Sequence, residues 1–214
     1  MGKVLKICVA TNNDHKMGEL KDIFKDYAVE LYSLKDLNID VNPDENGKNY
    51  AENAFIKASA VAKFTDMAVL SDDSGIEIEA LGEHVPGIYS HRYAVEHGGQ
   101  EITNKMLIEK CAGSKAHFTA HFVLLNLTSN SRHDFEGIVK GKIADKENGT
   151  GGFGYDPIFV PEGYQVSIAS LSPSEKNHIS HRYRASIALL NFLKNEKYIW
   201  FLKLFLFKKE EIIN

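Results

Sequence analysis

Two adjacent carboxylates, Asp72 and Asp73, follow a buried strand predicted at 67–70 and open the sequence Asp72-Asp73-Ser74-Gly75. Carboxylates at the end of an apolar strand are costly to bury unless they meet a cation. Such oxygen ligands suit magnesium, which proteins hold through one or two carboxylates together with substrate phosphates. Because successive strand residues point to opposite faces, we expect one aspartate to face the site and the other to face the structure. A turn that simply favours Asp and Gly is the alternative.

A polar loop between a predicted strand at 4–10 and a helix suggests phosphate binding. Its residues are Thr11, Asn12, Asn13, Asp14, His15 and Lys16. A strand–loop–helix junction offers free backbone N–H groups and a positive helix end to an anion, and Lys16 adds a point charge. The pattern GxxxxGK[ST] is absent, which excludes a P-loop ATPase. An ordinary capped loop explains the same residues without a ligand.

A glycine-rich segment could hold a nucleotide base. It consists of Gly151, Gly152, Phe153, Gly154, Tyr155, Asp156 and Pro157. Glycines let the backbone approach a ligand closely, Phe153 offers a stacking face, and Asp156 could accept from a ring N–H. A glycine-rich hairpin with an aromatic plug is the alternative.

Hydrogen-bond donors are concentrated in residues 175–182, Glu175-Lys176-Asn177-His178-Ile179-Ser180-His181-Arg182. Lys176 suits a phosphate, while His181 and Arg182 could donate to a carbonyl. A solvated, basic helix start is the alternative, and an HxxH pair without further ligands does not indicate a metal site.

The elements that must position these residues alternate without strict βαβ order, so an α/β fold with a mixed sheet flanked by helices is predicted. Asn49 caps the best helix, with Glu52 three residues on, and an apolar stripe follows from Ala51 to Ala62. Asn53 and Lys57 share a different face of this helix. Further predicted elements, by residue range, are strands at 28–34, 76–80, 117–127, 132–144 and 157–160, and helices at 100–111 and 182–194.

Composition narrows the function classes. The 214 residues are 43% hydrophobic and 25% charged, which favours a globular chain with a real core. A formal charge of -4 makes the protein a poor non-specific binder of nucleic-acid polymers. Two cysteines without a zinc spacing, and a start unlike a signal peptide, indicate a reduced, cytoplasmic protein.

Six short motifs follow one another along the chain. They are T-N-N-x-x-K, E-N-G-x-x-x-x-E-N-A-x-x-K-A, D-D-S-G-I, P-G-I-Y-S-x-R-Y, F-G-Y-D-P-I-F and E-K-x-x-I-S-H-R. In this order they closely resemble the inosine triphosphate pyrophosphatase family, also called dITP/XTP pyrophosphatases. The resemblance covers about residues 4–193, nearly the whole chain.

This resemblance implies an enzyme that hydrolyses ITP, dITP and XTP to the nucleoside monophosphate and pyrophosphate. It further implies an elongated, two-lobed α/β fold with a central mixed sheet, an active-site cleft between the lobes, a homodimer, and Mg²⁺ as cofactor. We therefore expect one two-lobed catalytic domain at 1–194, followed by a divergent apolar tail at 195–214.

The resemblance also implies roles for particular residues. Glu45 and Asp73 would hold magnesium, with Asp73 also serving as the base for water, although an isolated loop Glu is more often merely solvated. Arg92 would reach the phosphates. The implied substrate-binding residues are Thr11, Asn12, Asn13, Asp14, His15, Lys16, Lys57, Ser74, Phe153, Gly154, Tyr155, Asp156, Lys176, His181 and Arg182.

Two stretches depart from the family pattern. Tyr183-Arg184-Ala185 replaces the usual small residue followed by Lys-Ala or Gln-Ala, and the tail at 195–214 has no family counterpart. The apolar part of this tail, Tyr198 to Phe207, is too short to span a bilayer. A docking helix, a dimer contact and a divergent terminus all remain open for it.

Three rival functions stay open beside the first. A nucleotide sensor would bind purine triphosphates without cutting them, but it needs no water-activating acid such as Asp73. A hydrolase of pyrimidine or standard nucleotides is a second rival, although the Nudix pattern is absent. An interaction protein that docks through its apolar tail is the third.

Overall fold

The computed structural model describes residues 4–199, which fold around one mixed sheet of six strands in the order β2-β1-β3-β4-β5-β6. The strands are β1 (Leu5–Val9), β2 (Val29–Ser33), β3 (Ala68–Ile78), β4 (Lys115–Leu125), β5 (Arg132–Ile143) and β6 (Phe159–Pro161). Strands β2, β1 and β3 run parallel, whereas β3 to β6 pair antiparallel. The prediction of an α/β fold with a mixed central sheet is confirmed.

Helices flank this sheet on both faces. They are α1 (Asp14–Phe24), α2 (Tyr50–Val61), α3 (Ser90–Glu96), α4 (Gln100–Cys111), α5 (Pro173–Ile179) and α6 (His181–Asn195). Short 3₁₀ turns occur at Glu79–Leu81, Gly87–Tyr89, Asp156–Ile158 and Ile168–Ser170. The helices predicted at 100–111 and 182–194 are confirmed, whereas the seven-residue α3 was not predicted because its apolar pattern is too short to detect.

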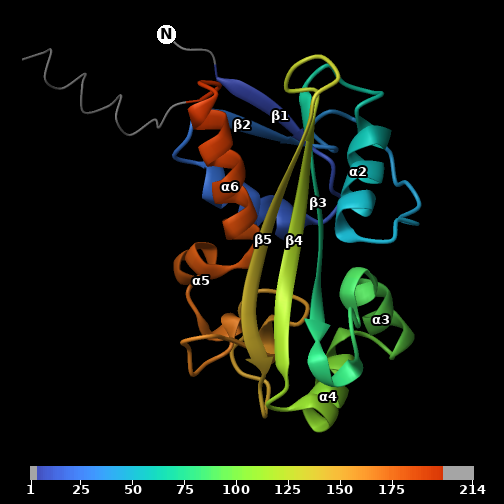
Figure 1. Cartoon of the computed structure of the whole chain (residues 1–214), viewed down its shortest axis with the longest axis vertical. Helices are drawn as coiled ribbons and strands as arrows, with labels where there is room; N and C mark the ends of the chain where they lie inside the picture. Colours follow the sequence, from blue (N-terminus) through green and yellow to red (C-terminus); the bar gives the residue numbers. More distant parts are fainter. Residues whose placement is uncertain (1–3, 200–214) are drawn as a thin grey trace, which may run out of the picture.

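The molecule is elongated because β3, β4 and β5 run along most of its length (Figure 1). Helices α1, α2 and α6 lie beside one end of these strands, and α3 and α4 lie at the other (Figure 1). One hydrophobic cluster lies where α1 and α6 pack on the sheet, and a second involves α2 on its other face. A third cluster, with α4, fills the opposite end. These clusters are the cores of the two predicted lobes.

The sequence suggested that a strand ends before Asp72, but strand β3 continues through the acidic residues to Ile78. It pairs with β4 from Val69, opposite Leu125, to Ile78, opposite Ala116, so Asp72 and Asp73 lie mid-strand. The turn alternative is therefore wrong. The strand predicted at 76–80 is part of β3 and stops earlier, since Ala80 belongs to a 3₁₀ turn.

Helix α2 begins where the sequence predicted. The Asn49 side chain accepts from the backbone N of Glu52 at 2.8 Å, and the Glu52 carboxylate accepts from the backbone N of Lys48 at 2.8 Å. One member of the predicted apolar stripe is not in the core. Phe55 is 38% exposed, and the Arg132 guanidinium covers its ring at 4.4 Å.

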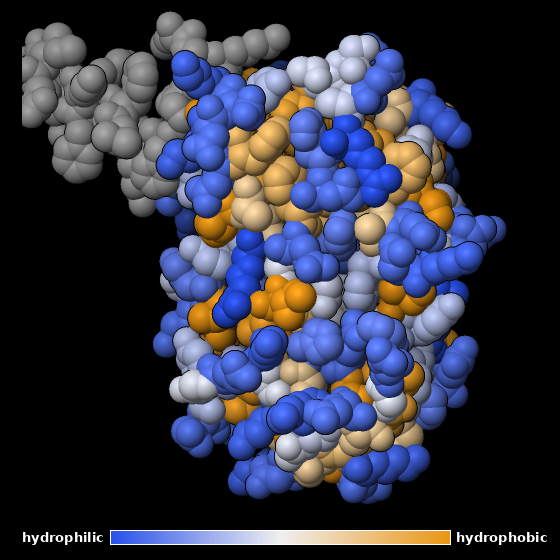
Figure 2. Space-filling model, viewed as in Figure 1, coloured by the Kyte–Doolittle hydropathy of each residue, from blue (hydrophilic) through white to orange (hydrophobic). Residues whose placement is uncertain are grey.

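Beyond α6, the chain continues against the core for a few residues. Ile199 is buried, and Tyr198 packs partly buried against the same cluster. Most of the predicted apolar tail, at 200–214, lies outside the described residues. No helix among residues 4–199 combines the length and apolar character needed to cross a membrane. On the face seen in Figure 2, hydrophilic residues predominate and hydrophobic ones form separate patches.

Candidate functional site

A cavity of about 590 Å³ collects side chains from both lobes. Residues singled out in the sequence that line it are Thr11, Asn12, Asn13, Lys16, Glu45, Lys57, Asp73, Ser74, Arg92, Phe153, Gly154, Tyr155, Asp156, Lys176, His181 and Arg182. Asp14 and His15 do not line it. Asp14 forms an exposed ion pair with Lys35 at 3.1 Å, and the His15 ring stacks on Phe153 with centroids 5.1 Å apart.

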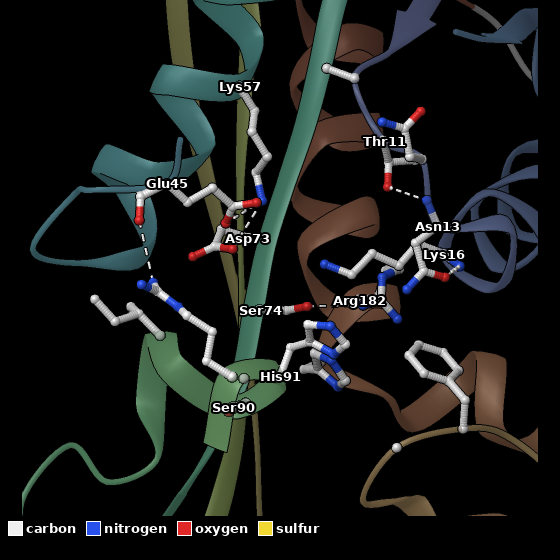
Figure 3. Close-up of a pocket in the computed structure, with 18 of the residues that line it drawn as sticks. Thr11, Asn13, Lys16, Glu45, Lys57, Asp73, Ser74, Ser90, His91 and Arg182 are labelled. Atoms are coloured by element: carbon white, nitrogen blue, oxygen red, sulfur yellow. Dashed lines mark hydrogen bonds and ion pairs between the residues drawn. The ribbon is translucent and has the colours of Figure 1, made fainter. Parts of the chain in front are cut away.

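An ammonium group joins two carboxylates on one side of the cavity. Nζ of Lys57 lies 3.0 Å from Oδ1 of Asp73 and 3.2 Å from Oε2 of Glu45 (Figure 3). Oδ2 of Asp73 accepts from the Asn53 amide at 3.3 Å. Asn53 and Lys57 are one helical turn apart on α2, so the face that they share holds Asp73 in place.

This arrangement fits a divalent cation. The two carboxylates share one positive charge, so they are close enough to hold a single cation between them. Carboxylate oxygens are ligands that magnesium prefers. Phosphate oxygens of a substrate and water molecules commonly supply the remaining ligands of a magnesium site. Among residues 4–199, no group of three or more acidic, histidine or cysteine side chains is placed to hold a metal ion, so a cation here would rest on these two carboxylates and on ligands from outside the protein.

Charge and burial oppose each other at this pair. Burial raises the pKa of Asp73, and the neighbouring Glu45 adds to this effect, although Lys57 and Lys16 favour the ionised carboxylate. Burial alone would lower the pKa of Lys57, but Asp73 and Glu45 raise it above its ordinary value. The ammonium is therefore firmly protonated, and Asp73 is a stronger base than an exposed aspartate.

Asp72 points away from this pair and is nearly inaccessible. Its Oδ2 lies 3.2 Å from Nζ of Lys16 and 2.9 Å from Nε of Arg182. Burial would raise the pKa of Asp72, but Lys16 and Arg182 hold it well below its usual range. Oδ1 of Asp72 has no hydrogen-bond partner in the described structure. The prediction that adjacent aspartates face opposite ways is confirmed, and both meet cations.

The loop before α1 is organised by its own side chains. Asn13 accepts from the backbone N of His15 and of Lys16, and Oγ1 of Thr11 accepts from the backbone N of Asn13. The expectation of free N–H groups is therefore wrong for residues 13, 15 and 16, because the helix cap already uses them. Thr11, Asn12, Asn13 and Lys16 of this loop line the cavity, and the positive charge among them is that of the Lys16 side chain, 14% exposed.

Phe153 marks the opposite end of the cavity. Nζ of Lys176 lies 5.1 Å and the Arg182 guanidinium 5.8 Å from its ring centroid. An aromatic ring flanked by cations offers a planar surface on which a base could stack. Phe153 lines the cavity and is only partly buried, which favours base stacking, although the His15 ring already stacks on Phe153 and the aromatic-plug alternative stays open.

The residues at 176–182 are not a solvated helix start. Lys176 is 7% exposed and Arg182 is 1% exposed. The junction between α5 and α6 packs directly on β5 at Gly137. A Cβ at this position would lie 2.1 Å from the backbone O of His181. A glycine at 137 is therefore required for α6 to bring His181 and Arg182 to the cavity.

Glu19 was missed by the sequence reasoning, and Asn53 was placed on the face of Lys57 but not named as a site residue. Glu19 binds Nζ of Lys176 at 2.6 Å and also pairs with Nη1 of Arg182. Burial would raise the pKa of Glu19, but these two cations lower it to about 2. Its position three residues after Lys16, on the same face of α1, was the available signal.

Asp156 lines the cavity and binds two neighbouring groups of the protein. Its Oδ2 accepts from Nζ of Lys176 at 2.7 Å and from the backbone N of Phe153 at 2.9 Å. Burial raises its pKa against the effect of Lys176. Asp156 therefore supports Phe153 and Lys176, and its contact with a ring N–H stays a prediction.

His181 is a buried, neutral histidine. Its ring stacks on Phe118 with centroids 4.8 Å apart and 11° between the planes. Burial, followed by the charge of Arg182, lowers its pKa to about 3. Its Nδ1 has no partner among the described residues. A neutral imidazole that lines the cavity can donate or accept one hydrogen bond according to its tautomer.

The segment at 86–92 closes the cavity from the second lobe. Nη2 of Arg92 donates to the backbone O of Glu45 at 3.3 Å, which links the lobes across the cavity. This segment packs directly on β3, because a Cβ at Gly75 would lie 2.2 Å from the backbone O of Gly87 and 2.5 Å from Oγ of Ser90. Gly75 therefore permits this close approach.

Comparison with known proteins agrees with this fold. The chain is 39% identical to a dITP/XTP pyrophosphatase of Thermoanaerobacter pseudethanolicus, over 88% of this chain and 96% of that protein. It is 40% identical to a dITP/XTP pyrophosphatase of Campylobacter jejuni, over 85% and 93%. The solved structure of a HAM1 protein from Coxiella burnetii superposes with a TM-score of 0.78, at 32% identity, over 89% and 99% of the two chains. The Ham1 family model matches residues 7–192. The chain therefore belongs to the Ham1 family.

Proposed function

We propose that this protein hydrolyses ITP, dITP and XTP to the nucleoside monophosphate and pyrophosphate. The names of its relatives support this activity. The observation that carries it is the division of the cavity: paired carboxylates at Glu45 and Asp73, cations along the walls, and an aromatic surface at Phe153. A triphosphate needs the first two, and a base needs the third.

In the proposed reaction, water attacks the α-phosphorus. A new P–O bond forms, the bond to the bridging oxygen breaks, and pyrophosphate leaves with the negative charge. Asp73 orients the water and accepts its proton, which suits a buried carboxylate with a raised pKa. Lys16 and Lys176 stabilise the charge that develops on the phosphates.

We assign Mg²⁺ to Glu45 and Asp73, whose carboxylates meet at Lys57. When bound, magnesium supplies positive charge that stabilises the phosphate oxygens and the leaving group. Ser74 and Lys57 lie beside this position and would contact the triphosphate, together with the loop at 11–16.

Selectivity for a 6-oxopurine would come from donors at the Phe153 end. Arg182 has five N–H donors. Three are used within the protein: Nε donates to Asp72, Nη1 donates to Glu19, and Nη2 donates to Ser74. The remaining two can donate to the purine carbonyl. Adenine carries an amino group there, and unpaired buried donors can reject such an analogue by up to about 10⁴-fold.

A cytoplasmic homodimer is part of this proposal. Val95 and Ile102 are exposed at 63% and 59% on α3 and α4, and such apolar side chains suit a subunit contact. Light scattering after size exclusion tests the dimer directly.

The activity is tested by incubating the protein with ITP, dITP, XTP, ATP, GTP and dUTP plus magnesium, with pyrophosphate and orthophosphate measured separately. Pyrophosphate formed only from the inosine and xanthosine nucleotides supports the proposal. Tight binding without product would favour a sensor, and product from dUTP or ATP at equal rates would favour a different triphosphate hydrolase.

A further inference from the structure

Lys57 stands where the proposed metal ion would be held. Its ammonium is within 3.0 Å of Asp73 and 3.2 Å of Glu45. Within the described part of the chain, no other cationic side chain forms an ion pair with either carboxylate. The Lys57 and Asp73 side chains are 14% and 8% exposed, so this contact is largely shielded from water.

We propose that Lys57 is a resident counter-ion that a divalent cation displaces, and that the displaced ammonium then binds the phosphates of the nucleotide. This inference rests on the metal site assigned to Glu45 and Asp73 under the proposed function. It adds that the site is never without a cation. It also makes one side chain responsible for coupling metal binding to nucleotide binding.

Electrostatics requires some cation at this position. Asp73 is largely buried, and Glu45, whose side chain is 38% exposed, lies near enough to share the same ammonium, so the two carboxylates repel each other unless a positive charge lies between them. Lys57 satisfies both in the ion-free protein. A divalent ion between the same oxygens would lie within a few ångströms of the ammonium, and their repulsion in a shielded site favours separation.

The Lys57 ammonium can move from the two carboxylates to the phosphates of a bound nucleotide. A lysine carries its charge on a flexible four-carbon stem, so Nζ can move several ångströms while α2 stays fixed. Lys57 lines the same cavity as Lys16 and Ser74, where the triphosphate is expected. Phosphate oxygens in that cavity would replace the carboxylate partners that the ammonium gives up.

Coupling between the two ligands follows from this exchange. Without nucleotide, the metal must displace an ammonium that has no other partner, so metal affinity is low. With nucleotide bound, the ammonium has phosphate partners and the metal binds more tightly. Linkage is reciprocal, so metal raises nucleotide affinity by the same factor.

The experiment titrates Mn²⁺ alone into the full-length protein at constant pH, and follows free Mn²⁺ by electron paramagnetic resonance. Lys57→Met keeps the length of the side chain and removes its charge. We expect this variant to bind Mn²⁺ about tenfold more tightly than the wild type, because a competing cation is gone. Lys63→Met is the matched control, since Lys63 is exposed just after α2 and should leave Mn²⁺ affinity unchanged.

A second titration contains a non-hydrolysable ITP analogue. The analogue should raise the Mn²⁺ affinity of the wild type and of Lys63→Met by a larger factor than that of Lys57→Met. Melting temperature supplies a check on folding. Lys57→Met should melt below the wild type without metal, because Asp73 and Glu45 then repel, and should recover more on addition of Mn²⁺.

The outcomes separate the inference from the proposals on which it rests. Equal or weaker Mn²⁺ binding by folded Lys57→Met overturns the exchange; the metal site survives that result if Glu45→Gln still loses Mn²⁺. Failure of every protein to bind Mn²⁺, with or without analogue, overturns the metal site and the exchange together. Hydrolysis is judged separately by the product assay.

Discussion

Asp72 and Asp73 are adjacent in the sequence, yet their carboxylates bind different ammonium groups on opposite faces of β3. Oδ2 of Asp72 lies 3.2 Å from Nζ of Lys16, and Oδ1 of Asp73 lies 3.0 Å from Nζ of Lys57. Only Asp73 lines the cavity, whereas Asp72 lies behind its wall. Removing the charge of Asp73 should therefore have a different effect from removing that of Asp72.

Asp73→Asn should abolish turnover and leave nucleotide binding largely intact. The amide keeps the size of the side chain but cannot accept a proton from water, so the loss should fall on kcat. Pyrophosphate release measures turnover, and calorimetry with a non-hydrolysable analogue measures binding. Near-normal turnover would remove Asp73 from the mechanism.

Asp72→Asn should instead lower stability. The buried Lys16 and Arg182 would each lose a counter-charge, and breaking a buried ion pair on one side typically costs about 3–5 kcal/mol. Urea unfolding measures the free-energy difference. Asp22→Asn, at an exposed position of α1, is the control and should change stability by less than about 0.5 kcal/mol. Equal stabilities for the two variants would contradict the role of Asp72.

Phe153→Ala should raise KM for ITP about 10- to 100-fold, which corresponds to roughly 1–3 kcal/mol of base stacking. The ring and its flanking cations, Lys176 and Arg182, form the aromatic end of the cavity. Steady-state kinetics with pyrophosphate detection gives KM. Phe64→Ala removes a ring that is 62% exposed and outside the cavity, and should leave KM unchanged. An unchanged KM in Phe153→Ala would mean that the base stacks elsewhere.

Arg182→Ala should narrow the gap in kcat/KM between ITP and ATP, because it removes the donors assigned to the purine carbonyl. The same change removes one of the two cations that pair with Asp72 and one of the two that pair with Glu19, so stability must be measured beside it. Arg182→Lys retains the charge without the planar set of donors, and should narrow the gap while losing less stability. A constant ITP-to-ATP ratio in both variants would refute the assignment.

His181 should make the folded protein sensitive to acid. Its pKa is lowered to about 3 in the fold from an ordinary 6.5, so the unfolded chain takes up a proton that the folded chain refuses. The contribution to stability is fully present above pH 6.5 and declines as pH falls toward 3. Between pH 8 and pH 5 the loss should be about 2 kcal/mol. Urea unfolding of the wild type and of His181→Asn at both pH values gives the free energies of unfolding, and their difference isolates the contribution of His181. His91→Asn, at an exposed position, is the control. Equal pH dependence in all three proteins would contradict the buried, neutral state of His181.

Much of the fold was predictable from local patterns. The apolar run at 4–10, the cap at Asn49 and the helix at 100–111 each carry their signal within a few residues, and the structure confirms them. The order of six motifs indicated the family, which the comparisons confirm. Local periodicity and turn chemistry suffice when the stabilising contacts are close in sequence.

Contacts between distant residues set the limit. The polar run at 71–75 reads as a turn because its counter-charges, Lys57 and Arg182, lie far away in the sequence. Glu19 was missed because its position near Lys16 on α1 was the one local signal, whereas its partners Lys176 and Arg182 lie far away in the sequence. A charged residue inside a strand becomes intelligible only when its partners are brought to it by tertiary structure.

The unbroken pairing of β3 with β4, from Val69 to Ile78, limits how the enzyme can move. Both lobes share this strand, and the acidic pair sits in its middle, so a swing of one lobe against the other would have to bend or twist the paired strands at the floor of the site. At the rim, Arg92 meets the backbone of Glu45 through a hydrogen bond that side-chain motion alone can open. Loop and side-chain motion at the rim is therefore the less costly route for substrate entry and product release.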